Sequence, residues 1–140
     1  MEYKYYAMEF LVRAFTGIIF LFQGYDKLFK VKIGGVVETF KYRAEKQHIP
    51  NTLLQLMATY SSVVEFLGGL FLIFGFFKNI TLILLGVDLL LVGAAFSMLE
   101  PVWDMKHVFP RLILVSALLI FPNTWEYYSL DHFMNENITK

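Results

Sequence analysis

Four apolar stretches dominate this 140-residue sequence, and each is long enough to cross a lipid bilayer. The hydrocarbon core of a bilayer is about 30 Å thick and takes roughly 20 helical residues to cross. The stretches cover residues 7–28, 53–77, 80–99 and 110–128. Lipid offers the backbone no hydrogen-bond partners, so only helices or closed barrels span it, and no stretch alternates as barrel strands do. We therefore predict an all-α fold, an integral membrane four-helix bundle forming a single domain over residues 1–140.

The composition agrees with a membrane location. Hydrophobic residues make up 57% of the chain and charged residues 17%, whereas soluble domains are about 45–50% apolar. Twelve basic residues cancel 12 acidic ones, so the basic excess typical of nucleic-acid binding is missing, and we expect membrane lipid but no nucleic acid as a partner. Cysteine is absent, which excludes disulfides and thiolate-ligated clusters within this chain.

Prolines and short polar segments mark the ends of the predicted spans. Pro50 precedes the second span, and Lys78 and Asn79 alone separate the second from the third, as in a tight helical hairpin. Pro110 suits the first turn of the fourth helix, where its missing N–H costs nothing. Pro122 lies within the fourth span and is expected to kink it.

The segment 31–49 between the first two spans is amphipathic. A short apolar stripe at near-helical spacing is formed by Val36, Val37, Phe40 and Ala44, and charged residues fill the remaining positions. This pattern predicts a short interfacial helix that caps the bundle. The alternative is an ordinary solvated helix in a loop.

Aromatic and basic residues indicate the topology. An even number of spans places both termini on one side, and aromatic residues, which favour membrane interfaces, flank both ends: Tyr3, Tyr5 and Tyr6, and Trp125, Tyr127 and Tyr128. Eight basic residues lie on the side of the two longer connections, namely Lys27, Lys30, Lys32, Lys41, Arg43, Lys46, Lys106 and Arg111. Three lie on the terminal side, namely Lys4, Lys78 and Lys140. The positive-inside rule then predicts periplasmic termini.

Ionisable residues inside the predicted spans are the candidates for function, because each costs roughly 2.5–3.5 kcal/mol to insert. The four that stand out are Arg13, Glu65, Asp88 and Arg111. Gln23 and Lys27 lie nearer the far end of the first span. We take Arg13, Gln23, Lys27, Glu65 and Asp88 as the candidate buried polar site.

Small residues predict how the first two spans pack. Arg13, Gly17, Gly24 and Lys27 share one helix face, and Ser61, Glu65, Gly68 and Gly75 share another, with Gly69 beside it. Faces rich in glycine let transmembrane helices approach closely. We therefore predict helix packing at Gly17, Gly24, Gly68, Gly69 and Gly75, and contact between Arg13 and Glu65.

Two interpretations of the polar residues remain open. The buried charges could form an ion pair that only fixes helix packing, or they could line a pocket for a quinone, a lipid headgroup, a proton or a small polar ligand. No metal site or catalytic residue is predicted, because the three histidines do not pair at helical spacing and no hydrolase or nucleotide-binding motif is present.

Several motifs resemble the DoxX-like family of small four-span membrane proteins. They are Arg13 in the first span, GIIFLFQGYDKLF at 17–29, Ile49-Pro50, and VVEFLGGLFLIFGFF at 63–77. The resemblance covers roughly the first 80 residues. It implies a multi-pass protein of the bacterial cytoplasmic membrane, in a family associated with quinol oxidation, thiosulfate:quinone oxidoreduction and membrane oxidoreductase complexes.

These observations lead to three functional hypotheses. The first is an accessory, non-catalytic subunit of a quinone-linked membrane redox assembly that shelters a quinone or lipid at its polar site. The second is a structural scaffold or assembly factor, and the third is a small proton-linked carrier. Each implies other membrane subunits or a homo-oligomer as partners, and we expect no cofactor within the chain beyond a bound quinone or lipid.

Overall fold

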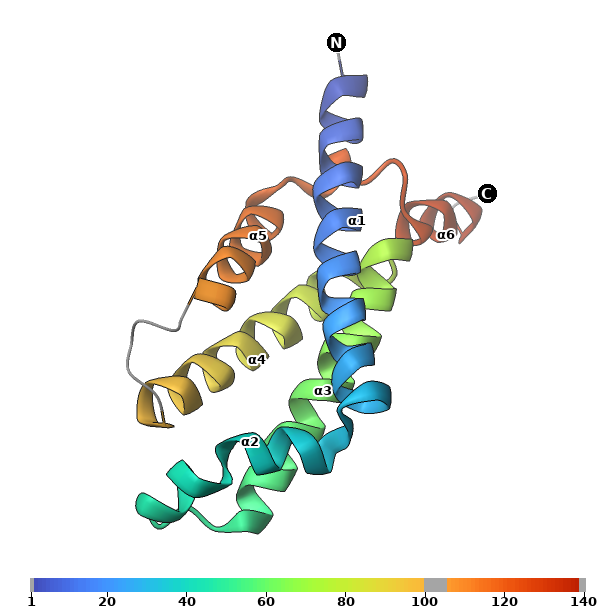
Figure 1. The fold of residues 1–140 in the computed structure, drawn as a ribbon. Coiled ribbons are helices and arrows are strands. Elements are labelled where there is room, and N and C mark those ends of the chain that lie inside the picture. The colour runs from blue at the N-terminus through green and yellow to red at the C-terminus, as the bar shows by residue number, and fades with distance from the viewer. Residues whose placement is uncertain (1, 100–105, 139–140) are drawn as a thin grey trace.

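Helices make up the fold that the computed structural model shows for residues 2–99 and 106–138 (Figure 1). The long helices are α1 (Tyr3–Tyr25), α3 (Asn51–Phe74) and α4 (Lys78–Leu99). Shorter helices are α2 (Lys32–Lys46), α5 (Phe109–Ile120) and α6 (Leu130–Ile138). A π-helical turn, Asp26–Lys30, continues α1, and a 3-10 turn, Asn123–Trp125, follows α5. The predicted helical membrane fold is confirmed, with three segments long and apolar enough to cross a bilayer: Tyr3–Lys30, Asn51–Phe74 and Lys78–Leu99.

The helix α3 has clear start and stop signals. Pro50 is extended and directly precedes it, and Gly75 follows it in the left-handed conformation with φ 66°. The N–H of Phe76 then donates to the carbonyl of Phe71 at 2.9 Å, and that of Gly75 to Leu72 at 3.1 Å. This arrangement satisfies carbonyls that the helix end would leave free, and it turns the chain back into α4.

Glycines allow α1 and α3 to pack closely in antiparallel directions. A methyl group added at Gly17 would collide with the backbone of Gly69, and one added at Gly24 would collide with the backbone of Phe66. Gly68 faces α4 instead, against the side chain of Leu85. Close backbone approach of this kind is how small residues stabilise helix pairs in lipid.

The bundle has an inner core and an apolar exterior. The core joins α1, α3, α4 and α5 through Phe20, Leu72, Leu82, Leu85, Leu89, Val115 and Leu118. Large apolar side chains also remain exposed on the outer faces of α3 and α4, among them Leu56, Leu67, Ile83 and Leu90. An exterior of this kind is suited to lipid rather than to water.

The predicted fourth span differs from the structure at Pro122. We expected one kinked helix over 110–128, but α5 ends at Ile120, and Phe121 is extended. Pro122 has no N–H to bond back into the helix and disfavours helical backbone before it, so the helix stops instead of bending. At 1.5 Å per residue, the 12 residues of α5 reach about 18 Å, and the span count of four remains a prediction.

The two terminal aromatic clusters contact each other at one end of the bundle. Tyr5 stacks on Trp125 with ring centroids 4.8 Å apart, and Tyr6 stacks on Tyr127 at 5.4 Å. Both chain ends lie at this end of the bundle (Figure 1). We call it the terminal end, and the opposite one, where α2 crosses α3, the α2 end.

Candidate functional site

The buried charges form two clusters at different levels of the bundle, and Arg13 and Glu65 belong to different ones. The predicted contact between them is wrong. Arg13 pairs with Glu9 at 2.9 Å, whereas Glu65 pairs with Lys27 at 2.7 Å. Packing Gly17 against Gly69 places Arg13 level with the end of α3, beyond Glu65, and brings Lys27 to the acid instead.

The terminal cluster consists of Glu9, Arg13, Lys78 and Glu126. Glu9 accepts from Arg13 and lies 3.5 Å from the ammonium of Lys78, which in turn pairs with Glu126 at 2.7 Å. All four residues are buried. Two positive and two negative formal charges cancel, so the cluster joins α1, α4 and the segment after α5 without net charge.

Arg13 also closes the end of α3 through backbone carbonyls. Its guanidinium donates to the carbonyls of Leu72 at 2.6 Å, Ile73 at 3.2 Å and Tyr128 at 2.6 Å. A cation at a helix C-terminus is favourable, because the last carbonyls carry partial negative charge. These contacts give the terminal cluster a structural role, because they hold neighbouring elements together. The hydrogen bonds of the Arg13 guanidinium all go to other groups of the protein.

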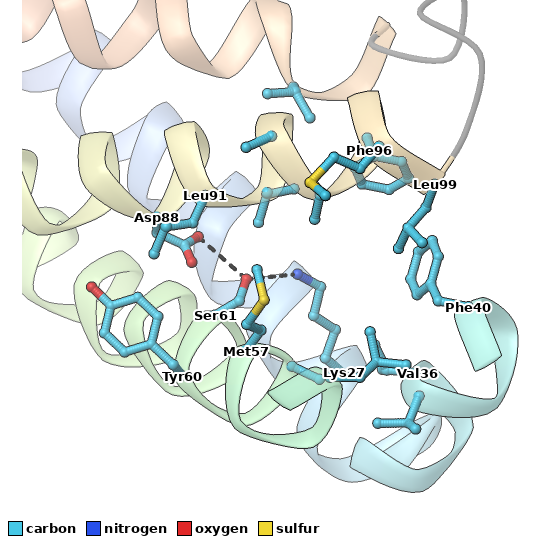
Figure 2. Close-up of a pocket in the computed structure, with 18 of the residues that line it drawn as sticks. Lys27, Val36, Phe40, Met57, Tyr60, Ser61, Asp88, Leu91, Phe96 and Leu99 are labelled. Atoms are coloured by element: carbon cyan, nitrogen blue, oxygen red, sulfur yellow. Dashed lines mark hydrogen bonds between the residues drawn. The ribbon is translucent and has the colours of Figure 1, made fainter. Parts of the chain in front are cut away.

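The inner cluster consists of Lys27, Ser61, Glu65, Asp88 and Arg111. Glu65 lies 2.7 Å from the ammonium of Lys27 and 3.7 Å from the guanidinium of Arg111. Lys27 donates to the hydroxyl of Ser61, which donates to Asp88, both at 3.3 Å (Figure 2). Two cations again balance two carboxylates, at a depth where unbalanced charge is costly.

The backbone places each of these groups. Lys27 lies in the π-helical turn Asp26–Lys30, where the N–H of Val31 bonds back to Asp26 at 2.8 Å. Such turns occur often at functional sites. Ser61 and Glu65 are four residues apart on one face of α3, and Asp88 lies near the middle of α4.

The cations and the acids of the inner cluster differ in accessibility. The side chains of Lys27 and Arg111 are 21% and 12% exposed, whereas Glu65 and Asp88 are 0% exposed. Among the described residues, Arg111 has its only ion pair at 3.7 Å, longer than a hydrogen bond. The cluster therefore presents its two cations outward, with Glu65 behind them.

A cavity of about 430 Å³ adjoins the inner cluster. Its polar lining comprises Gln23, Lys27, Tyr60, Ser61, Asp88, His107 and Arg111, and the rest is mostly apolar. Figure 2 shows Asp88 at one end of the cavity and Phe40 and Leu99 at the other, with α2 forming part of the wall. The volume and lining are typical of a small-molecule site.

The apolar stripe of α2 forms part of this cavity. Val36, Val37 and Phe40 line it, and the ring of Phe40 meets that of Phe96 on α4 edge to face, with centroids 5.4 Å apart. The side chain of Gln47, just after α2, donates to the backbone carbonyl of Met98. The predicted amphipathic helix is therefore present and covers the α2 end of the cavity.

The sequence profile of the DoxX family matches residues 8–99. The chain belongs to the DoxX family. DoxX proteins are small membrane proteins, which agrees with the three long apolar helices. No curated protein and no solved structure matches the chain.

The DoxX match contains most, but not all, of the inner cluster. Lys27, Ser61, Glu65 and Asp88 lie within residues 8–99, whereas Arg111 comes from α5, outside the match. The site of this DoxX protein is thus completed by a residue that the family profile does not reach.

Five residues of the two clusters were absent from the predicted site: Glu9, Ser61, Lys78, Arg111 and Glu126. Of these, Arg111 had stood out in the sequence as an ionisable residue within a predicted span. Glu9 precedes Arg13 by four residues, the spacing at which helical side chains pair, and Ser61 precedes Glu65 by the same step. These two signals were readable in the sequence. Lys78 and Glu126 gave no such signal, because their pairing depends on how the segment after α5 folds back.

Proposed function

We propose that this DoxX protein binds a quinone in the cavity beside its inner cluster, as an accessory, non-catalytic subunit of a quinone-linked membrane redox assembly. The observation that carries the proposal is one cavity with largely apolar walls and a charged, hydrogen-bonding end. A quinone has matching parts, a small polar ring and a long apolar tail. The ring would lie at the inner cluster, with the tail along the apolar wall.

The depth of the polar end favours a quinone over a phospholipid. Asp88 is ten residues from the start of α4 and 11 from its end, about 15 Å from either. A phospholipid keeps its charged headgroup at the membrane surface. An uncharged ring can reach the middle of the bilayer, where the inner cluster offers it hydrogen bonds.

The side chains that the chain offers support the proposed accessory role. Without cysteine the chain cannot ligate an iron–sulfur cluster through thiolates, and no group of potential metal ligands occurs within residues 2–99 and 106–138. Electrons for a bound quinone would come from a partner subunit. The exposed apolar faces of α3 and α4 would meet lipid, such a subunit or a second copy of this chain.

The proposed location is the bacterial cytoplasmic membrane, with both termini in the periplasm. It is supported by the eight-to-three asymmetry of basic residues and by the contact between the two terminal aromatic clusters. Reporter fusions at each terminus, active on only one side of the membrane, test it. Activity of a cytoplasmic reporter at either terminus would reverse the orientation.

Co-purification tests the proposed ligand. The protein is extracted with its surrounding lipid in nanodiscs, and bound quinone is measured by mass spectrometry. Ala95→Phe should fill the cavity and remove the quinone, because Ala95 lines it. Leu90→Phe is the matched control on the same helix, since Leu90 is 65% exposed on the outer face.

The outcome separates the three hypotheses. Quinone bound to wild type and Leu90→Phe, but lost from a folded Ala95→Phe, supports the proposal. A stable protein without any bound small molecule would favour a scaffold. A pH-driven flux in vesicles, unaffected by filling the cavity, would favour a proton-linked carrier.

A further inference from the structure

The cavity beside the inner cluster has an edge on the outer surface of the bundle, between α3 and α4. Tyr60 on α3 and Leu91 on α4 line the cavity (Figure 2), and these residues are also 38% and 42% exposed. Residues that border both a cavity and the exterior lie at its mouth. Resting on the proposed function, we propose that the quinone enters through this mouth from the bilayer and that its tail leaves the cavity there into lipid.

The size of the cavity makes an exit for the tail necessary. A volume of about 430 Å³ lies within the range of sites that hold a drug-sized ligand. Such a site takes up the ring and the first part of a tail, whereas a tail of many isoprene units is larger than the whole cavity. The rest of the tail therefore has to lie outside, on the surface of the bundle.

The course of α3 and α4 produces the mouth. The two helices are joined by a short turn and diverge towards the α2 end (Figure 1). Near the turn they pack together, because a methyl group added at Gly68 would lie 3.0 Å from the side chain of Leu85. Farther along, the hydroxyl of Ser61 still reaches Asp88 at 3.3 Å. On the α2 side of that hydrogen bond, the helices are separated by the cavity.

The mouth lies at a depth where it meets lipid. Tyr60 is nine residues from the start of α3, and Leu91 is eight residues from the end of α4. At 1.5 Å per residue, both lie about 12–14 Å from the α2 end of their helices. Leu53 and Met98 on the same two helices are also exposed and line the cavity, so the mouth continues from this depth towards the α2 end. A ligand dissolved in the membrane can reach it without crossing water.

The other sides of the cavity are less suited to an apolar tail. The close packing of α1 on α3 closes one side. The α2 end is closed by a buried apolar core that joins α2 to α3 and α4, namely Val37, Ala44, Leu54 and Leu99. From α1 and the segment before α5, the cavity is lined by the polar side chains of Gln23 and His107. An apolar tail leaves such groups without hydrogen bonds, which is costly where they are buried.

Photolabelling of the wild-type protein in nanodiscs tests the path of the tail. The probe is a quinone that carries a diazirine on its tail, close to the ring, and mass spectrometry identifies the labelled residues. Labels that disappear with excess unlabelled quinone report the bound ligand. We expect these labels at Tyr60, Leu91 and their neighbours on α3 and α4. Labels concentrated at Gln23 or His107 instead would overturn the inference.

Blocking the mouth tests its role in binding. The chain has no cysteine, so Leu91→Cys can be modified selectively with a bulky maleimide. The modification should weaken binding of a long-tailed quinone at least about tenfold, equivalent to about 1.4 kcal/mol, and leave binding of a tail-less, fully methylated benzoquinone nearly unchanged. Leu90→Cys, modified in the same way, is the matched control, because Leu90 is exposed on the same helix and does not line the cavity.

The results distinguish this inference from the proposed function. If modified Leu91→Cys binds the long-tailed quinone as tightly as modified Leu90→Cys does, the proposed path of the tail is overturned while quinone binding stands. If neither quinone binds the wild-type protein, the proposed function fails as well. The photolabelling needs no variant, so it decides the path of the tail even where modified Leu91→Cys folds poorly.

Discussion

Removing Arg13 should show which of two acids it is energetically coupled to. The structure pairs it with Glu9 at 2.9 Å and adds three backbone carbonyls. Arg13→Met deletes all of these hydrogen bonds and leaves Glu9, within the part of the chain that the structure describes, with the more distant Lys78 at 3.5 Å. Breaking a buried ion pair from one side typically costs about 3–5 kcal/mol, and we expect a loss of unfolding free energy in that range.

The formal charges of the terminal cluster predict how the double variants behave. Arg13→Met leaves the cluster with one excess negative charge, Glu9→Gln with one excess positive charge, and the two together with none. The double variant should therefore lose less stability than the sum of the single ones, by about 1–3 kcal/mol.

Glu65 supplies the control for this coupling. Arg13 bonds to the carbonyl of Leu72, seven residues along α3 from Glu65 and thus about 10 Å away at 1.5 Å per residue. The effects of Arg13→Met and Glu65→Gln should therefore add within about 0.5 kcal/mol.

Chemical unfolding in detergent micelles, followed by circular dichroism, measures all of these variants. Arg13→Lys should fall between wild type and Arg13→Met, because an ammonium keeps the charge but lacks the planar fork that serves Glu9 and the carbonyls together. Strong coupling to Glu65, with additivity towards Glu9, would refute the register that we describe for α1 and α3.

Five further substitutions test the packing and the turns by thermal unfolding. Gly69→Ala should cost about 1–3 kcal/mol, because the added methyl meets the backbone of α1, and should cost more than Gly68→Ala, whose methyl meets a movable leucine side chain. Gly34→Ala, with nothing within 4 Å, is the control and should not destabilise; an equal loss at all three would contradict the packing. Asp131→Ala should cost about 0.5–2 kcal/mol, because this carboxylate accepts from two backbone N–H groups at the start of α4, at 3.0 Å each; an unchanged midpoint would argue against that cap. His48→Gly should raise the midpoint, since φ 58° costs a residue with a Cβ about 1–2 kcal/mol and costs glycine almost nothing; a lower midpoint would argue against the left-handed turn after α2.

Hydropathy predicts the long helices well because lipid leaves the backbone few alternatives. The three long spans require only length and apolar composition, and both are local properties of the sequence. The fourth span shows where this reasoning stops. The predicted span runs past Pro122 to residue 128, but the helix ends at Ile120, because a proline cannot donate the backbone hydrogen bond that would continue it.

The partner of Glu65 could not be chosen from the sequence. The face that α1 and the π-helical turn after it present to α3 carries two cations, Arg13 and Lys27, with Gly17 and Gly24 between them. Sliding α1 along α3 by a few turns exchanges one cation for the other and keeps glycines at the contact. Only the fit of Gly17 against Gly69 resolves the register, and that fit is a property of the packed pair.

Predicting the cavity from the sequence would require knowing how α2 packs against helices that are distant from it in the chain. The sequence marks one face of α2 as apolar but does not say what lies against it, and in the structure it covers a space beside the inner cluster. The turns that set α2 there are held by Lys32 and His48, both in the left-handed region, with φ 60° and 58°. Neither residue type favours this conformation in the way glycine does, so no local pattern indicates these turns. The charged and polar groups of the site can therefore be recognised in the sequence. The shape of the cavity cannot, because it depends on two turns that the packing of α2 on α3 and α4 must stabilise.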